Sequence, residues 1–514
     1  MPMLQKVYVA HEKEQMRWHW KGNLQDTMQY IFKHKKFYEC MDELRVTDKH
    51  DYRTISKISE GLQEDWFNNL KTLKLLQCCG SKPYAIPSNV LLSLKILEEL
   101  EVEKCSKIIS IFEVDNSKIK ETSFQLKKLT LKSLSKVTHV WQHNKQGILG
   151  FQDLQQVRIF MCNKLKTVFP VALARNLKKL EKLNVLSHQQ RLEDQSSTSI
   201  ISRQPVFTNK EAISNVKTLY LNQNQILALS SWLAQSVNQG LQYLIELGVV
   251  NFAEVKNNDD GENSALLLEI LDKTPNLERF EIRNHHFKSI NIPEEAGKRM
   301  LGLKELSLLS LSELNAISGV EYLLNLQLLK VSGCPKLTTL GQTCSNLKEL
   351  DISICHRLEC LFTSLAAKLL IHLEELKVSR CDLLKEIVGK EQQSDETATA
   401  STATKDIELK RLERIKLHSL KNLECFYSGS AILKLPSLIW VNIEDCPAMK
   451  SFSQQGAVHV EERSRPIQTR HLLTLVPTHL FVSNCVLIKK KKFFSGHLRT
   501  HLNTITCQRV QSYS

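Results

Sequence analysis

A short apolar pattern returns along this chain about every 21 to 29 residues, and it constrains the fold more than any other feature of the sequence. In the pattern, a leucine is followed by two other residues, an apolar residue, one other residue and a second apolar residue. It reads LKKLTLKSL from Leu126, LQLLKVSGCPKL from Leu326 and LEELKVSRCDLL from Leu373. Because so many copies keep the same internal spacing, the abundance of leucine does not explain them.

The apolar pair at the centre of the pattern occurs in fourteen clear copies. These are Leu73/Leu75, Leu100/Val102, Leu129/Leu131, Val157/Ile159, Leu183/Val185, Leu219/Leu221, Leu247/Val249, Phe280/Ile282, Leu306/Leu308, Leu329/Val331, Leu350/Ile352, Leu376/Val378, Ile415/Leu417 and Val441/Ile443. Two weaker copies, Val7/Val9 and Leu44/Val46, precede them.

Alternation with a period of two predicts a short strand with one buried face at each copy. One copy cannot bury its apolar side alone, so successive copies must stack into a continuous core. This spacing is the signature of leucine-rich repeats. The sequence therefore predicts an α/β fold, a leucine-rich-repeat solenoid shaped like a horseshoe. Its parallel β-sheet lies on the concave side, and its convex side is irregular or helical.

Seven of the fourteen cysteines occupy the same turn position just after the strand. They are Cys78, Cys105, Cys162, Cys334, Cys355, Cys381 and Cys446. A small thiol that points inward and meets backbone groups suits this position, so we expect these cysteines to be buried structural residues. The sequence has no C-x-x-C pair, which argues against a structural zinc site, and unpaired thiols are typical of a reducing compartment.

The repeat pattern and the charge together divide the chain into three regions. The net charge is +14, and residues 455–514 carry nine Lys or Arg and two Glu, so half of the excess lies there. We expect degenerate repeats over 1–66, the repeat solenoid over 67–454 and a basic, disordered tail over 455–514. Because the solenoid has no basic groove, we expect it not to bind nucleic acid.

The sequence has no apolar run long enough to span a membrane and no leader at its start, which indicates a cytoplasmic protein, with the nucleus as an alternative.

The segments between the predicted strands vary in kind. Residues 230–241, 264–273 and 364–373 are apolar on one side and predict helices on the convex side. Residues 187–205 and 390–406 are rich in Ser, Thr, Gln and acidic residues, which predicts loops.

Motifs that carry catalysis or cofactor binding are missing from the sequence. It contains no G-x-x-x-x-G-K-[ST], H-E-x-x-H, G-x-S-x-G or kinase signature. The histidines are scattered, and the pair His285 and His286 would point to opposite sides of a strand. We therefore predict no enzymatic activity, no catalytic residues, no cofactor and no metal site.

Residues that flank or separate the apolar pair should project outward from the sheet in columns. One column reads Arg158, Tyr220, Lys330, Asp351, Lys377, Lys416 and Asn442, and its neighbour includes Gln156, Thr218, Glu349, Glu375, Arg414 and Trp440. Aromatic residues flanked by charges favour protein interfaces, although they can equally serve to cover neighbouring leucines. The predicted partner-binding residues on the concave face are Arg158, Phe160, Tyr220, Lys330, Asp351, Lys377, Lys416 and Trp440.

Three longer phrases resemble a known family. They are LKTVFPVALARNLKKLEKLNV (165–185), HLEELKVSRCDLLKEIVGKE (372–391) and LPSLIWVNIEDCPAMKSFSQQG (435–456). Over about residues 4–455, the chain resembles the leucine-rich-repeat region of plant coiled-coil nucleotide-binding leucine-rich-repeat (NB-LRR) disease resistance proteins. The resemblance implies a recognition module in plant defence. Its partner would be a pathogen effector, a guarded host protein or the nucleotide-binding domain of a resistance protein.

The sequence departs from that family in lacking the coiled coil and the nucleotide-binding domain, so we expect it to be a fragment of such a protein. Two other classes of repeat protein remain as alternatives. A substrate adaptor or scaffold, such as an F-box-type ubiquitin-ligase subunit, would show an F-box ahead of the repeats, and we find none. An extracellular receptor would show near-constant repeats with paired cysteine caps, which are likewise missing.

Overall fold

The computed structural model describes the chain in segments that fall into two compact units. The described residues are 8–12, 15–21, 41–47, 69–77, 83–86, 90–91, 94–113, 124–141, 151–165, 168–169, 177–186, 215–222, 225–226, 229, 233, 241–250, 270–271, 273–342, 345–389, 406–454 and 458–459. Unit 1 covers Met1–Ala253 and unit 2 covers Glu254–Ser514. The main strands of each unit stack repeat by repeat, and the two units are taken in turn.

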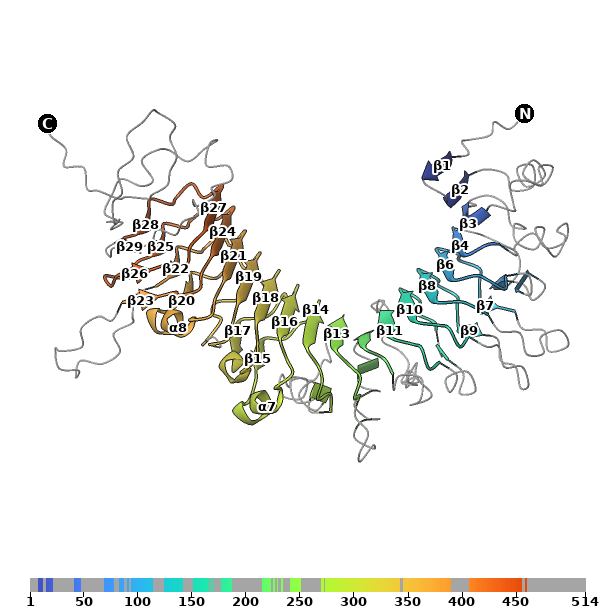
Figure 1. Cartoon of the computed structure of the whole chain (residues 1–514), viewed down its shortest axis with the longest axis horizontal. Helices are drawn as coiled ribbons and strands as arrows, with labels where there is room; N and C mark the ends of the chain where they lie inside the picture. The colour runs from blue at the N-terminus through green and yellow to red at the C-terminus, as the bar shows by residue number, and fades with distance from the viewer. Residues whose placement is uncertain are drawn as a thin grey trace, which may run out of the picture. The chain divides into compact units, whose positions relative to one another are not determined.

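The sheet of unit 1 contains one short strand for each repeat (Figure 1). Its strands are β1 (Tyr8–Glu12), β2 (Gln15–Lys21), β3 (Met41–Thr47), β4 (Thr72–Leu76), β6 (Glu99–Glu103), β8 (Lys128–Lys132), β10 (Gln156–Phe160), β11 (Lys182–Leu186), β12 (Thr218–Asn222) and β13 (Glu246–Val250). From β2 to β13 neighbouring strands pair in parallel, and from β4 onward equivalent positions of the repeat lie opposite each other.

The sheet of unit 2 follows the same plan. Its strands are β14 (Arg279–Arg283), β16 (Glu305–Leu309), β18 (Leu328–Ser332), β19 (Glu349–Ser353), β21 (Glu375–Ser379), β24 (Arg414–His418) and β27 (Trp440–Glu444). All six neighbouring pairs are parallel and in register. Parallel stacking of the predicted strands is thus confirmed within each unit, and the predicted fold class is correct.

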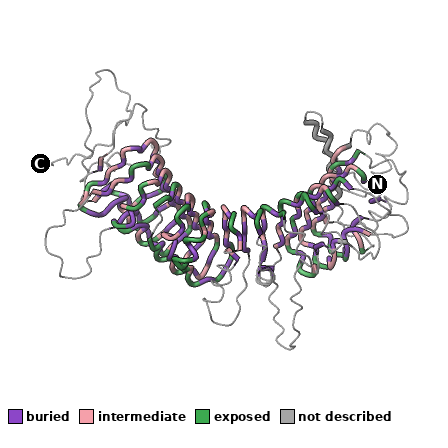
Figure 2. Tube along the Cα trace, turned by 60° about the horizontal axis from the view of Figure 1, so that its bottom comes forward, coloured by how far each residue is buried: buried purple, intermediate pink, exposed green. Residues whose placement is uncertain are grey.

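The predicted alternation of burial is also confirmed. Along most strands the pattern is outward, buried, outward, buried, outward, as the alternating colours of the trace show (Figure 2). Both members of every clear apolar pair are buried except in the last pair, where Val441 is buried and Ile443 is half-buried. The inward residues of stacked strands therefore form the continuous core that a single repeat could not provide.

The first weak copy of the pattern was interpreted wrongly. Val9 lies in β1, which pairs antiparallel with β2, and Val7 lies outside the described residues. The strand that stacks in parallel on β3 is β2, where Trp18 and Trp20 stand opposite the members of the Leu44/Val46 pair. Two tryptophans therefore take the place of the apolar pair in this strand, and a pattern built on aliphatic residues does not detect them.

The return side of each unit contains further short parallel strands where the sequence predicted an irregular or helical convex side. In unit 1 these are β5 (Tyr84–Ile86), β7 (Ser110–Phe112) and β9 (His139–Trp141). In unit 2 they are β15 (Ser289–Asn291) with β17 (Ala316–Ser318), then β20 (Cys360–Phe362), β22 (Glu386–Val388), β25 (Cys425–Tyr427) and β28 (Ser451–Ser453), and finally β23 (Ile407–Glu408), β26 (Leu433–Lys434) and β29 (Val458–His459). β29 ends beyond residue 454, the predicted limit of the solenoid.

Helices are short in the described part of the return side. Those whose bounds are described are α7 (Glu294–Arg299), the 3-10 helix η3 (Val320–Tyr322) and α8 (Ser364–Leu369), and residues 90–91, 225–226, 229, 233 and 270–271 are helical as well. α8 confirms the first half of the helix predicted at 364–373, and it is capped by Thr363, whose Oγ1 accepts a 3.2 Å hydrogen bond from the Ala366 amide. Most of 230–241 and 264–273, and the predicted loops 187–205 and 390–406 up to residue 405, lie outside the described residues, as does the predicted tail beyond residue 459.

The residue after each repeat strand commonly has a left-handed backbone conformation. φ is 54° at Lys104 and 55° at Ile354, and only at Gly333 (69°) does a glycine take this position. The Lys104 amide donates a 2.9 Å hydrogen bond to the carbonyl of Lys132, and the Ile354 amide a 3.0 Å bond to that of Ser379. Each bond joins one repeat to the next and offsets the unfavourable φ of a non-glycine residue.

The turn cysteines come directly after these left-handed residues in the chain. Cys105, Cys162, Cys334, Cys355, Cys381 and Cys446 are buried thiols, as predicted, and Cys78 lies outside the described residues. Each Sγ donates to the backbone carbonyl two residues earlier, at 3.4–3.8 Å. Loss of hydration on burial raises the pKa of Cys162 and of Cys446 to about 11. These two thiols therefore stay protonated and unreactive at neutral pH.

Candidate interaction surface

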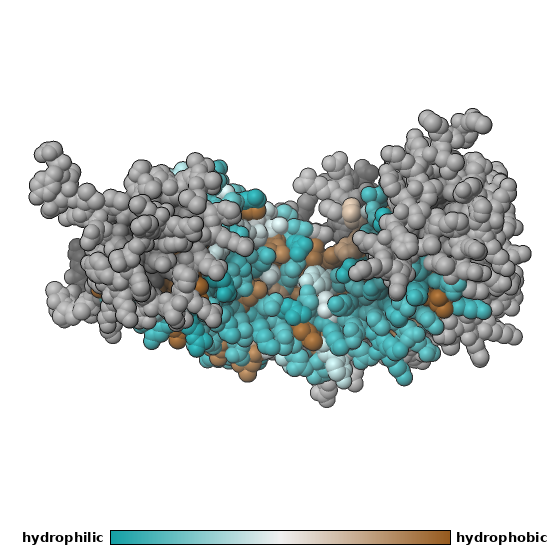
Figure 3. Space-filling model, turned by 45° about the horizontal axis from the view of Figure 1, so that its top comes forward, coloured by the Kyte–Doolittle hydropathy of each residue, from teal (hydrophilic) through white to brown (hydrophobic). Residues whose placement is uncertain are grey.

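The outward residues of the main strands form three parallel columns in each unit, and we call them together the sheet face. The leading, middle and trailing columns contain the first, third and fifth residues of each five-residue strand. Strand register places these residues side by side, so each has an equivalent neighbour about 4.8 Å away on the next strand. In a space-filling view, hydrophilic side chains cover most of the described surface, with separate apolar patches among them (Figure 3).

In unit 2 the structure brings four predicted residues into one row of the middle column. Lys330, Asp351, Lys377 and Lys416 lie on the consecutive strands β18, β19, β21 and β24. Lys330 Nζ lies 3.6 Å from Asp351 Oδ2, so these two opposite charges form an ion pair. The predicted row of lysines is therefore real, but its first charge is already compensated within the sheet.

Lys377 is held between two carboxylates of the leading column. Its Nζ lies 2.7 Å from Glu349 Oε1 and 3.1 Å from Glu375 Oε1. Partial burial lowers the pKa of Lys377, but the hydrogen bonds and charges of the two glutamates together outweigh it and hold the pKa above its ordinary value. Lys377 is thus cationic but locally neutralised, which weakens its attraction for an acidic partner.

Lys416 differs from the other lysines of this row. It is exposed, and no ion pair joins it to any residue in the described part of the chain. Its neighbour Arg414 is instead paired with Glu375, with Nη2 3.2 Å from Oε2. Lys416 therefore contributes a positive charge that the sheet does not compensate.

At the end of this row the prediction was wrong for one residue. Trp440 is half-buried on β27, as an outward aromatic would be, but Asn442 is only 8% exposed instead of facing solvent. The Asn442 side chain donates a 2.9 Å hydrogen bond from Nδ2 to Glu444 Oε1. This bond folds the amide along its own strand, so Asn442 acts in local structure.

In unit 1, Tyr220 has a structural contact that the sequence did not reveal. A Cβ added at Gly248, the facing residue on β13, would lie 2.2 Å from the Tyr220 ring, so the ring occupies the space above the glycine. The tyrosine hydroxyl donates a 2.6 Å hydrogen bond to Glu246 Oε1. Tyr220 is therefore half-buried, with its ring over Gly248 and its hydroxyl bonded to Glu246. The remaining part of the side chain is exposed on the sheet face.

The other two predicted residues of unit 1 lie on β10. Arg158 is exposed in the middle column, and Phe160 is half-buried in the trailing column beside Leu186 of β11. With the Gln156 amide turned so that its oxygen faces the guanidinium, that oxygen accepts bonds of 2.7 and 2.9 Å from Arg158 Nε and Nη2. A neutral amide thus orients the cation of Arg158 without compensating its charge.

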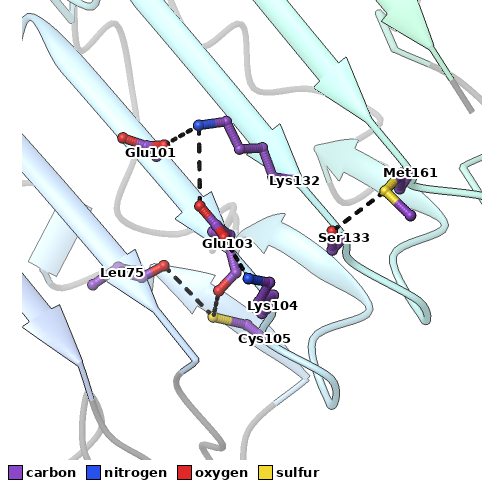
Figure 4. A network of polar contacts seen from close by, with 8 residues as sticks. All are labelled: Leu75, Glu101, Glu103, Lys104, Cys105, Lys132, Ser133 and Met161. Carbon is purple, nitrogen blue, oxygen red and sulfur yellow. Dashed lines mark hydrogen bonds and ion pairs between the residues drawn. The ribbon is translucent and has the colours of Figure 1, made fainter.

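A charged network on β6 and β8 was missed by the sequence analysis (Figure 4). Lys132 Nζ lies 2.6 Å from Glu101 Oε1 and 4.0 Å from Glu103 Oε2, and Lys128 pairs with Glu99. Aligning the repeats would have placed lysines opposite glutamates here. The sequence therefore contained the information that predicts these ion pairs, in the alignment of one repeat with the next.

Other kinds of site receive no support from the described residues. Among them, no group of three or more His, Cys, Asp or Glu side chains is arranged to hold a metal ion. Within the same residues, no helix is both long and apolar enough to cross a membrane.

The fold and its columns of outward side chains define a leucine-rich-repeat solenoid. A family described as plant disease resistance protein RPS2-like, leucine-rich repeats, matches residues 41–189 and 339–455, which together are more than half of the chain. The chain belongs to this plant disease resistance family.

Comparison with other proteins adds a structural neighbour. No curated protein sequence matches the chain. Among solved structures, the crystal structure of a TLR13–ssRNA13 complex is similar over 79% of this chain and 62% of that chain, with 16% identity and a TM-score of 0.33. The similar part therefore spans less than two thirds of that chain.

Proposed function

We propose that this chain is a recognition module in plant defence, which senses a pathogen effector or a guarded host protein through its sheet face. The family assignment supports a defence-related interaction module. The observation that carries the proposal is the ordered display of outward side chains. Most repeat strands present three outward side chains at regular spacing, and the buried residues between them hold that display in place.

The chemistry of the sheet face supports a protein partner. It combines aromatic residues, such as Phe160 and Trp440, with charged residues that include the uncompensated Arg158 and Lys416. Aromatic and arginine side chains are enriched among the residues that dominate binding energy at protein interfaces.

Site-specific photo-crosslinking tests this proposal. A benzophenone amino acid placed at Lys416 probes the sheet face of unit 2, and the same residue at Lys385, which is exposed beside β22, is the matched control on the return side. The protein is irradiated in extracts of infected and uninfected leaves. We expect a discrete crosslinked partner from position 416 and none from position 385. A partner found only after infection identifies an effector, and one found in both extracts identifies a host protein.

The binding test uses Trp440→Ala with Lys416→Glu. Lys377 is left unchanged, because a glutamate there would stand against Glu349 and Glu375 and would confuse lost binding with lost stability. We expect this double variant to lose the crosslink while keeping its circular dichroism spectrum. Crosslinks that arise from position 385 alone, or that persist in the double variant, contradict a recognition role for the sheet face.

A further inference from the structure

One region of the sheet face in unit 1 combines uncompensated positive charge with apolar side chains. It consists of Arg158, Phe160 and the following Met161 from β10 and its turn, with Lys182 and Leu186 from β11. We call these five residues the β10–β11 patch. Within the patch, β10 and β11 pair in parallel, so Gln156 faces Lys182 and Phe160 faces Leu186.

The two cations of the patch have no acidic partner among the described residues. Arg158 and Lys182 are both exposed, and the guanidinium of Arg158 bonds the neutral Gln156 amide. Their register neighbours are also neutral. Arg158 lies between Thr130 and Asn184, and Lys182 lies between Gln156 and Thr218. From Arg158, Lys182 lies one strand across (about 4.8 Å) and two residues along (about 6.6 Å), so both long side chains can reach one carboxylate cluster.

The apolar part of the patch lies at the trailing end of the same strands. Met161 is 49% exposed, and Phe160 and Leu186 are half-buried beside each other. Left-handed backbone at Met161 turns the chain there, with φ of 53°. The methionine thioether accepts a weak 3.8 Å bond from the Ser133 hydroxyl. Flexible, polarisable methionine beside an aromatic ring suits the binding of an apolar side chain.

Neighbouring strands do not share this character. On β6 and β8 the lysines are bound to glutamates, and on β12 and β13 Tyr220 is bound to Glu246. The patch is thus a local excess of positive charge with an apolar border. Two cations flanked by acidic strands do not provide the continuous basic track that a nucleic acid backbone requires.

We propose that the β10–β11 patch binds a protein segment in which acidic residues flank a large apolar residue. The carboxylates meet Arg158 and Lys182, and the apolar residue rests on Phe160, Met161 and Leu186. This rests on the proposed function, and it adds the location of the contact and the chemistry of the partner. Charge complementarity selects the partner, because the same segment meets only compensated lysines at Lys330 and Lys377.

Selection from a random peptide display library tests the proposal with the full chain. The expected result is enrichment of peptides that combine Asp or Glu with Leu, Phe, Trp or Met. Their affinity should fall at least about tenfold in the variant Arg158→Ser/Lys182→Ser, and should weaken as salt increases. The matched control is Lys136→Ser/Lys178→Ser, which removes the same charge at exposed positions of unit 1 away from the outward columns, and should leave affinity unchanged.

A second variant, Phe160→Ala/Met161→Ala, tests the apolar contact separately, with circular dichroism confirming the fold. It should weaken the selected peptides but spare any purely electrostatic binding. A fluorescent single-stranded DNA is the competing probe. Binding of that DNA through Arg158 and Lys182, with no enrichment of acidic peptides, overturns the proposal.

The remaining outcomes separate this proposal from the proposed function. Selected peptides that ignore Arg158 and Lys182 but depend on Lys416 and Trp440 overturn only the location, since the sheet face still binds. Selected peptides that tolerate both pairs of substitutions argue against binding by the sheet face itself.

Discussion

The β10–β11 patch of unit 1 and the lysine row of unit 2 both place cations at outward positions of the sheet face, yet they differ in electrostatics. In unit 2, Lys330 is paired with Asp351 and Lys377 lies between Glu349 and Glu375, whereas Lys416 at the end of the row is not compensated by any described residue. In unit 1, Arg158 and Lys182 have only neutral neighbours in register. A column of cations on a repeat sheet therefore predicts a binding surface only when the adjacent columns and strands supply no carboxylates.

The patch and the lysine row both lie over a fully buried core of leucines. Leu183→Ala under the patch and Leu376→Ala under the lysine row each delete a side chain that is at most 1% exposed. We expect each to cost about 2–5 kcal/mol of unfolding free energy, because a cavity remains. Hydrogen exchange should show lost protection mainly in the altered repeat and its neighbours. Uniform loss across both units would show that the repeats do not respond locally.

Alkaline pH should destabilise both units through their turn cysteines. Burial raises the pKa of Cys162 and Cys446 to about 11 from the value of 9.0 expected in an unfolded chain. Between these values the unfolded state loses a proton that the folded state keeps. The stabilisation from each buried thiol is therefore fully present below pH 9 and is lost as the pH rises towards 11. This loss lowers the free energy of unfolding by about 2–3 kcal/mol for each thiol. Denaturant titrations of Cys162→Ala and Cys446→Ala should show a shallower decline, and an unchanged slope contradicts the assignment.

Gly248→Ala tests how firmly the sheet face next to the patch is fixed. The new Cβ would lie 2.2 Å from the Tyr220 ring, so the ring must move and its bond to Glu246 must break. We expect a loss of about 1–3 kcal/mol from this overpacking. In a Tyr220→Ala background the same substitution should cost almost nothing, and a full cost there would place the strain elsewhere.

The electrostatic difference between the patch and the lysine row can be removed by substituting the glutamates that compensate Lys377. Glu349→Gln with Glu375→Gln takes the carboxylates away from Lys377 and should change stability by less than about 1 kcal/mol, since these pairs are partly exposed. Peptides selected on the patch should then also bind unit 2, even when Arg158→Ser and Lys182→Ser are present. The control Glu294→Gln/Glu359→Gln changes the same charge on the return side and should gain no binding.

The smallest expected effect concerns the turns that both regions share. Ile354 has φ of 55° and is 36% exposed, so a glycine there removes backbone strain that outweighs the packing lost with its partly exposed side chain. We expect Ile354→Gly to stabilise the chain by about 0.5 kcal/mol, whereas Ser353→Gly, one residue earlier in the strand, should destabilise it by a similar amount. Thermal unfolding of the two variants distinguishes them, and equal shifts would show that the left-handed turn carries no strain.

The sequence by itself determined the repeat strands, their buried pairs and the role of the turn cysteines. These follow from spacing, because a period of two fixes which side chains turn inward and stacking leaves them one place to go. It also placed Lys377 and Glu349 in adjacent columns. It did not show that they bind each other, because side-chain pairing depends on reach across strands.

The tertiary structure alone decided which charges of the sheet face are compensated, that Asn442 is buried, and that Tyr220 covers Gly248. It also decided that β1 runs antiparallel to β2 and that short strands line the return side. The physical reason is that most of these features depend on contacts between residues of different repeats. A repeat pattern specifies its own fold locally, but the properties of its surface arise only when neighbouring repeats are brought into register.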